Sequence, residues 1–163
     1  MTAFAGASLD TVYTAADLTG ANSGKAPGIG DLFVSHDNKK YRFVKYNAGV
    51  GAVAAVAGNV AYFYAPSGVS TGVTNEVTSD LSDSNNLGAG VLMSAPANGN
   101  YCWVQIKGVA TLNTALTAGA DGNALTAAGA TDGTLDVSAA VTDAIVAYAV
   151  DASAKIVMCD FPE

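Results

Sequence analysis

The sequence predicts an all-β fold: a single compact β-sandwich or β-barrel-like domain of short antiparallel strands, with an extended N-terminal arm and at most one short helix. Short runs of β-branched and aromatic residues recur between turn-forming residues, which is typical of strands. The breaks include Asn-Gly and Asp-Gly pairs, which tolerate the positive φ angles of tight hairpins. Charged residues make up only 13% of the chain, too few for a coiled coil, and the 50% apolar content argues against disorder.

Residues 1–30 are predicted to form the extended arm, and residues 31–163 the β-rich domain. The arm segment is rich in Ala, Gly, Ser and Thr, and residues 22–30 have the composition of a loop. Its few bulky side chains are isolated from one another, so they are interpreted as anchors along an extended segment. In the domain, ten strands with turn signals between them favour a sandwich or barrel over βαβ units. The expected strands are 31–35, 40–46, 60–65, 72–78, 87–94, 101–107, 109–112, 134–137, 145–151 and 155–161.

Two further segments have patterns of their own. Residues 48–58 carry valines three positions apart and are interpreted as a short buried helix over an open end of the sheet, although three glycines weaken that prediction. Residues 115–119 and 124–129 are near-duplicates on either side of an Asp-Gly turn, so we expect a local hairpin-like repeat.

The two cysteines, Cys102 and Cys159, each lie in an apolar, strand-like run. Two cysteines do not make a disulfide framework, so we expect buried thiols, with a disulfide as the alternative. They also lack the further ligands that a zinc site needs.

The sequence contains partial matches to catalytic and metal-binding motifs, but none has the neighbouring residues and local structure that the chemistry requires. Residues 68–72 match the G-x-S-x-G nucleophile elbow, yet a β-branched segment follows and the sole histidine, His36, lies upstream. Residues 20–25 resemble a phosphate-binding loop that is one residue too short. Residues 80–88 gather oxygen ligands suited to calcium, but Leu87 breaks the loop template. We therefore expect a protein that is not an enzyme and has no cofactor and no metal site.

The charge is unevenly distributed along the chain. The net charge is −7, and residues 47–163 hold only Lys107 and Lys155 as basic residues, so nucleic acid is not an expected partner. The basic cluster 39–45 alternates with apolar residues, which favours the solvated face of a strand over a patch for a partner's acidic surface. No signal peptide is evident, and the longest apolar run is far shorter than the roughly 20 residues that span a bilayer. We expect no membrane partner and synthesis in a cytoplasm.

One strand combines aromatic and polar side chains. Two readings are open for its aromatic face: the rings cap the core or a subunit contact, or they stack on a sugar. Strand alternation places Tyr101, Trp103, Gln105 and Lys107 on this face, and Cys102, Val104 and Ile106 on the other.

The small number of ionisable residues predicts an oligomer. A soluble monomer usually has about 25–35% charged residues on its surface, and this chain falls short of that. Faces shared between copies would remove apolar surface from water.

The C-terminal half resembles the head decoration (capsid cement or stabilising) proteins of tailed bacteriophages. In that family an aromatic-Val-Gln-x-Lys-Gly strand leads through Ala/Thr/Gly-rich hairpins to a closing pair of strands. The resemblance covers roughly residues 87–161, and residues 1–86 match only in style. It rests on Tyr101-Cys-Trp-Val-Gln-Ile-Lys-Gly-Val-Ala-Thr-Leu112, Ala115-Leu-Thr-Ala-Gly119, Asp132-Gly-Thr-Leu-Asp-Val137 and Ala144-Ile-Val-Ala-Tyr-Ala-Val-Asp151.

This resemblance implies a non-enzymatic virion protein on the exterior of an icosahedral capsid. Its expected partners are itself, as a homotrimer at local threefold positions, and the major capsid protein, whose capsomers it would clamp together. An acidic protein suits the outside of the shell better than its DNA-lined interior. The arm would order on binding and add a strand to a capsid sheet edge. The anchors expected to do this are Phe4, Leu9, Val12 and Tyr13.

The alternative from another class is a carbohydrate-binding module or adhesin. It would use Tyr101 and Trp103 as a stacking platform for a sugar.

Overall fold

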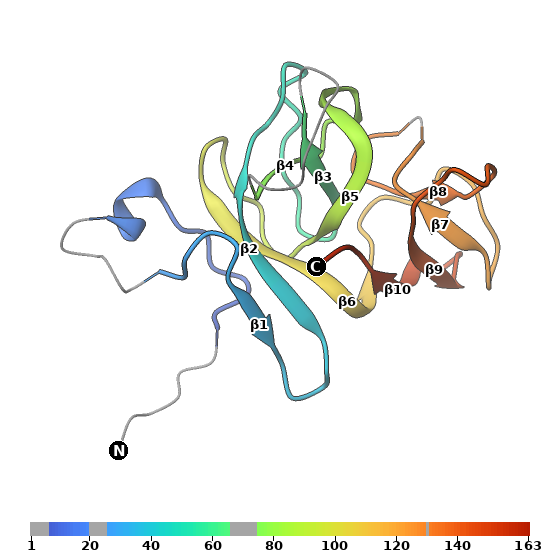
Figure 1. Cartoon of the computed structure of the whole chain (residues 1–163), viewed down its shortest axis with the longest axis horizontal. Helices are drawn as coiled ribbons and strands as arrows, with labels where there is room; N and C mark the ends of the chain where they lie inside the picture. Colours follow the sequence, from blue (N-terminus) through green and yellow to red (C-terminus); the bar gives the residue numbers. More distant parts are fainter. Residues whose placement is uncertain (1–6, 20–25, 66–74, 130) are drawn as a thin grey trace.

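In a computed structural model of the chain, residues 7–19, 26–65, 75–129 and 131–163 are described, and nearly all of their regular structure is β (Figure 1). Two short 3₁₀ turns accompany the strands in these ranges, η1 (Ala15–Leu18) and η3 (Leu81–Asp83). The strands are β1 (Leu32–Val34), β2 (Lys40–Tyr46), β3 (Val60–Tyr64), β4 (Glu76–Thr78), β5 (Ser84–Leu92), β6 (Tyr101–Thr111), β7 (Ala124–Thr126), β8 (Asp136–Val137), β9 (Ile145–Asp151) and β10 (Ile156–Asp160).

Five strands close into a barrel. They follow one another in the order β2, β4, β3, β5 and β6, and β6 pairs back onto β2. The β2–β4 contact is parallel, through Lys45 opposite Glu76 and Tyr46 opposite Val77, and the other contacts in the ring are antiparallel. The all-β prediction is confirmed, and its two options resolve as a barrel with extra strands.

Strand β6 joins the barrel to the C-terminal sheet. It is 11 residues long; its first part pairs with β2 and β5, and Lys107–Thr111 pair with β10. Strands β9, β7 and β8 follow β10 in order, so the C-terminal strands extend outward from the barrel wall (Figure 1). On the other side, β1 pairs with Lys40–Arg42 and projects from the barrel together with β2.

One continuous core fills the barrel and reaches into the C-terminal sheet. The inward residues of β6, Cys102, Val104 and Ile106, are fully buried in it, as alternation predicts. The same cluster of buried side chains includes Leu125 of β7 and Val157 of β10. The two parts of the fold therefore share their hydrophobic stabilisation.

The expected buried thiols are confirmed. Cys102 and Cys159 are both free and buried, one in β6 and the other in β10. Burial raises the pKa of each thiol to about 12, so both stay protonated at neutral pH.

The predicted helix over residues 48–58 is wrong, because this segment forms turns and loop. Gly49 and Ala52 adopt left-handed φ angles of 72° and 52°, which interrupt any helix. Backbone N–H groups of the loop donate to the carboxylates of Asp80 and Asp83, far away in sequence. These long-range bonds outweigh a valine spacing that three glycines already weaken.

Other predicted boundaries agree closely with the strands. Strands β2 and β9 have the predicted bounds, and the two strands expected over 101–112 form the single β6. The repeat at 124–129 yields β7, whose partners are β8 and β9 and not residues 115–119. Strand β4 forms the last three residues of the expected strand 72–78, Asn75 is not part of a strand, and residues 72–74 lie outside the described ranges.

Candidate interaction surfaces

An aromatic surface lies outside the barrel, on β1, β2 and β6. We call it the aromatic cluster. Because side chains alternate along a strand, Tyr41 and Phe43 of β2 point away from the barrel interior on the same side as the outward residues of β6. Three of the rings, those of Tyr41, Phe43 and Trp103, are buried, although they are separate from the main core. The cluster consists of Phe33, Tyr41, Phe43, Tyr101 and Trp103.

The rings contact one another edge to face and in stacks. Phe43 lies at the centre, with its centroid 5.3 Å from that of Trp103 and 5.4 Å from that of Tyr13, both in edge-on geometry. Tyr101 stacks on Phe43 at 6.1 Å, and Phe33 meets Trp103 edge-on at 6.2 Å. Each such pair adds about 0.5–1.5 kcal/mol beyond the burial of its area.

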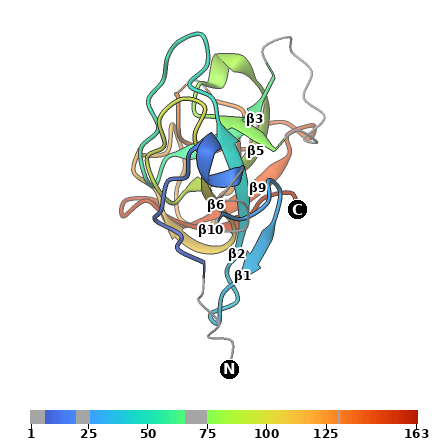
Figure 2. The same cartoon turned by 90° about the vertical axis from the view of Figure 1, so that its left-hand side faces the viewer.

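The N-terminal arm covers this cluster, and Figure 2 shows its turn η1 in front of the barrel strands. Ala7, Leu9, Tyr13 and Leu18 are half-buried and pack against its rings. The arm joins the sheet through a β-bridge in which the N–H of Tyr13 donates to the carbonyl of Tyr101 (2.9 Å) and the N–H of Tyr101 donates back (2.8 Å). The following turn η1 is closed by the Asp17 carboxylate, which accepts from the N–H and the hydroxyl of Thr14, both at 2.7 Å.

The structure brings together two of the four expected anchors. Leu9 and Tyr13 pack on the chain's own cluster, while Val12 is half-buried and is not part of it. Phe4 lies outside the described residues. Alternation of Tyr41 with Phe43 and of Tyr101 with Trp103 signals the cluster in the sequence, but the cover that the arm provides depends on tertiary contacts that no local pattern reports.

Trp103 is enclosed and has an unmet hydrogen bond. The side chain is 3% exposed, so its ring has no open face on which a sugar could stack while the arm is in place. Its Nε1 has no hydrogen-bond partner among the described residues, and neither does the buried hydroxyl of Ser94. A buried donor without a partner costs about 1–3 kcal/mol, so an acceptor brought to the indole N–H would be stabilising.

The lysines of segment 39–45 are paired with carboxylates. Lys45 contacts Glu76 at 3.1 Å, Lys40 contacts Glu163, and Lys39 in the preceding turn lies 3.5 Å from Asp37. Arg42 is buried with its guanidinium 6.0 Å from the Phe63 ring centre. Most of segment 39–45 forms the predicted strand, but the predicted solvated face is wrong at Arg42, whose side chain is buried beside Phe63.

In segment 80–88, which the sequence offered as a source of calcium ligands, the carboxylates of Asp80 and Asp83 stabilise the fold. Asp80 begins η3 and accepts hydrogen bonds from the N–H (3.1 Å) and hydroxyl (2.6 Å) of Ser82 with one oxygen. Its other oxygen accepts from the N–H of Gly51 at 2.9 Å, and Asp83 holds Val50 in the same way. Burial raises the pKa of Asp80, but these hydrogen bonds outweigh it and keep the pKa below its ordinary value. Across the described ranges, no three His, Cys, Asp or Glu side chains come together as a metal site.

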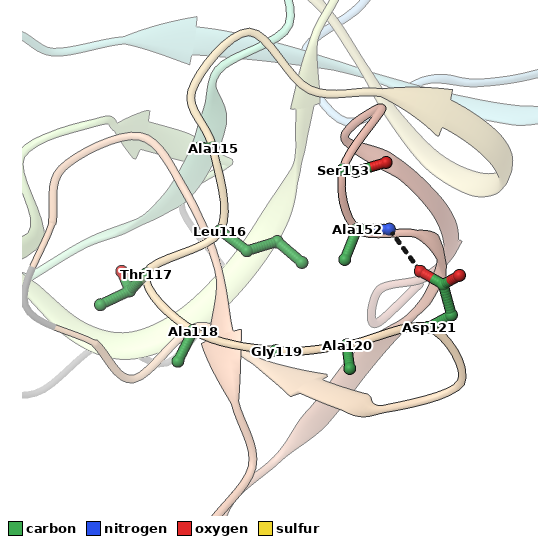
Figure 3. A pocket seen from close by; sticks show the side chains of 9 residues that line it. All are labelled: Ala115, Leu116, Thr117, Ala118, Gly119, Ala120, Asp121, Ala152 and Ser153. Carbon is green, nitrogen blue, oxygen red and sulfur yellow. Dashed lines mark hydrogen bonds between the residues drawn. The ribbon is translucent and has the colours of Figure 1, made fainter.

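A hollow of about 730 Å³ opens between residues 115–121 and the turn at Ala152 and Ser153 (Figure 3). Apart from Leu116, the lining side chains are small, and the backbone N–H of Ala152 donates to the Asp121 carboxylate at 2.8 Å across one side. The hydroxyl of Ser153, in the lining, donates to the Asp151 carboxylate at 2.7 Å, and the same oxygen accepts from the N–H of Ala154 at 2.8 Å, so this pair closes the turn. The hydrogen bond between Ala152 and Asp121 fastens one loop to another.

A second hollow, of about 500 Å³, lies beside the outer surface of β6, β10 and β9. The turn Asp37–Lys39 forms one wall, and Val109, Met158 and Tyr148 line it from the sheet. Lys107 and Asp160 stand at its edge and form an ion pair at 3.6 Å. Val109, Met158 and Tyr148 are exposed apolar residues, so part of this hollow is apolar.

Together these features define an all-β barrel protein whose N-terminal arm is folded over an external aromatic cluster. Comparison with known proteins gave no match to a family model, to a curated protein or to a solved structure. No helix in the described part of the chain has the length and apolar character to cross a membrane. The motif letters at 20–25 and 68–72 fall outside the described residues.

Proposed function

We propose that the protein is a non-enzymatic virion structural protein that binds the outer surface of an icosahedral phage capsid as a homotrimer and stabilises contacts between capsomers. The observation that carries the proposal is the arm lying over the aromatic cluster, where a β-bridge between Tyr13 and Tyr101 joins it to the sheet. A short arm held in this way can leave its own body and add a strand to the sheet edge of a partner.

In this proposal the arm changes partners on the shell. Leu9, Val12 and Tyr13, together with Phe4, contact the capsid protein, and the aromatic cluster left behind forms a second contact. Trp103 supports this because its unmet indole N–H would gain an acceptor on the partner surface. The exchange is energetically feasible because apolar side chains are buried in both states.

Charge and sequence pattern support the same assignment. The net charge of −7 suits an exterior position, where repulsion from packaged DNA is not encountered. The segments that resemble decoration proteins include β6, which joins the barrel to the C-terminal sheet, and β8 and β9, which belong to that sheet.

The test mixes the full chain with undecorated capsid shells of the phage that encodes it and measures co-sedimentation and copy number per shell. We expect saturation at hundreds of copies and a higher temperature of shell disruption. Binding at about a dozen copies or fewer would instead identify a connector or tail component, and an absence of binding would overturn the proposal.

The arm is tested separately from the function. Replacing Leu9 and Tyr13 together with Ser should lower shell occupancy severalfold, whereas Val141→Ser, at a fully exposed position, should leave it unchanged. If the arm variant binds as well as the wild type, the contact lies elsewhere on the protein while the capsid assignment stands.

The carbohydrate alternative predicts glycan binding that Trp103→Ala abolishes, but the enclosed Trp103 ring does not favour it.

A further inference from the structure

Arg42, the only arginine of the chain, carries a buried charge that forms no ion pair with any described residue. The residue is 7% exposed. On β2 it alternates with the outward rings of Tyr41 and Phe43, so its side chain lies on the interior side of the barrel wall. Its Cζ is 6.0 Å from the centre of the Phe63 ring. No described residue accepts a hydrogen bond from the guanidinium.

A buried arginine normally has an anionic partner. Arginine stays charged in proteins, and a charge that loses its water is costly unless it is paired and hydrogen-bonded. Burial lowers the pKa of Arg42 below its ordinary value, which reflects this loss of hydration. The Phe63 ring compensates only in part, because a cation–π contact leaves the five N–H donors without an acceptor.

The guanidinium can still be reached from solvent. In the described part of the chain, the side-chain donors that are both fully enclosed and unpartnered belong to Ser94 and Trp103. The unpartnered nitrogens of Arg42 are not among them, so the small exposed part of the residue includes these nitrogens. An acceptor that arrives from outside can therefore contact a charge that is otherwise enclosed.

Two lysines near Arg42 already have carboxylate partners. Lys40 lies two residues earlier on the same side of β2, and Lys107 of β6 is its direct partner across the strands. Glu163 bonds to Lys40, and Asp160 pairs with Lys107 at 3.6 Å. The hydrogen bond from Lys40 and the nearby charges of Lys107 and Arg42 lower the pKa of Glu163. A carboxylate is thus accommodated close to Arg42, but the guanidinium itself is left without a bond.

The chemistry of the guanidinium favours a single carboxylate as its ligand. Its planar fork of donors binds a carboxylate through two parallel hydrogen bonds. A polyanion such as a nucleic acid would be repelled along its length, because the net charge of the chain is −7. One carboxylate meets this repulsion only once, and exposed charges more than about 8 Å away are largely screened at physiological salt.

We infer that Arg42 is an anion-binding site that takes one carboxylate group, supplied by a small carboxylic acid or by an acidic side chain of a partner protein. Two N–H groups of the guanidinium donate to the two oxygens of the bound group. Lys40 and Lys107 offset the repulsion between this carboxylate and that of Glu163. The site does not depend on the proposed capsid role, because it requires only the guanidinium and the charges around it.

The Nε–H signal of the sole arginine gives a direct test by nuclear magnetic resonance. Acetate added to the isotope-labelled full chain at constant ionic strength should shift this signal along a saturating curve, and chloride should not. Glu163→Gln should tighten acetate binding severalfold, because the neighbouring carboxylate no longer repels the ligand. A shift that does not saturate, or one that chloride reproduces, would overturn the inference.

Thermal unfolding measures the same binding in a variant that lacks the arginine. Acetate should raise the melting temperature of the wild type by mass action, and Arg42→Met should abolish this rise. The variant should fold, because an apolar side chain replaces a buried charge without a partner. Lys45→Met is the matched control, since it removes a cation of the same strand that is paired with Glu76, and it should keep the rise. An equal rise in the wild type and Arg42→Met would overturn the inference.

A capped peptide whose only charge is one glutamate separates the two sources of the carboxylate. If it binds more tightly than acetate, the site takes an acidic side chain of a partner protein. If acetate binds at least as tightly, the ligand is a small acid. The counterpart with glutamine should not bind, and equal binding of the two peptides would overturn the inference because the contact would then not require a carboxylate.

Discussion

The backbones of Tyr13 and Tyr101 exchange two hydrogen bonds, of 2.9 and 2.8 Å, and so attach the N-terminal arm to strand β6. The Tyr13 ring adds an edge-on contact to Phe43 at 5.4 Å, beside Trp103. Backbone pairing and ring packing at one position thus hold the cover over the aromatic cluster.

Replacing Tyr13 with Ala should loosen the arm and admit water to Trp103. The half-buried ring and its aromatic contact account for roughly 1–2 kcal/mol of unfolding free energy. The chain has one tryptophan, so its fluorescence should shift to longer wavelength in the native state. Val12→Ala is the control, because Val12 is not part of the cluster, and an equal shift in both variants would contradict the described packing.

Replacing Tyr62 with Phe should destabilise the link between the barrel and the C-terminal region. The buried hydroxyl donates to the carbonyl of Thr134 and accepts from its N–H at 3.0 Å. Its loss leaves both backbone groups unpaired in the core, at a cost of about 1–3 kcal/mol. Urea unfolding should show this cost for Tyr62→Phe and almost none for Tyr148→Phe, whose side chain is half-exposed. Equal stability of the two variants would show that the hydroxyl is dispensable.

Local patterns predicted the strands whose stabilising contacts follow strict alternation. In β2 and β6, β-branched and aromatic residues mark both the strand and its two faces, so the inward Cys102 and Val104 were assigned to the correct side. Strand β7 was missed because Ala-Leu-Thr carries little strand preference and pairs with strands later in the sequence. The helix prediction at 48–58 failed for a similar reason, since Asp80 and Asp83 fix that loop from about 30 residues away.

The sequence predicted only some of the residues that form the interaction surfaces. Leu9 and Tyr13 stood out as isolated bulky residues in a small-residue segment, which identified them as anchors. Their position on the chain's own aromatic cluster depends on the fold, as does the alignment of Val109, Met158 and Tyr148 across three strands. Burial of Trp103 likewise depends on the fold, because Phe33 and Phe43 lie against its ring.

Gly90 should be among the least replaceable residues of the barrel. Strand β5 carries an extra residue at Ala89, and Gly90 follows it with a φ of 146°. A Cβ at this position would lie 2.8 Å from the carbonyl oxygen of Gln105 on β6. Conformational strain and overlap together predict a loss of roughly 3–4 kcal/mol for Gly90→Ala.

Gly99 provides the matched control for this effect. It also has a positive φ, of 82°, but a Cβ there meets nothing within 4 Å. Gly99→Ala should therefore lose only about 1 kcal/mol. Comparing the melting temperatures of Gly90→Ala and Gly99→Ala separates backbone strain from the overlap of the added Cβ with Gln105. Similar melting temperatures would mean that β5 and β6 can move apart without a loss of stability.

Acid should weaken the loop at 48–58 through Asp80. Hydrogen bonds from Ser82 and Gly51 outweigh the effect of burial and lower the pKa of this carboxyl in the folded protein. The folded pKa lies below the unfolded value, so the stability that Asp80 contributes is present above the unfolded pKa, near pH 4, and is lost as pH falls through the folded pKa.

Asp80→Asn should cost about 2 kcal/mol at pH 7, because neutral acceptors form weaker hydrogen bonds. It should also flatten the decline of unfolding free energy between pH 5 and pH 3, measured by urea titration. A variant whose decline stays parallel to that of the wild type would show that other carboxyls are responsible for the acid sensitivity.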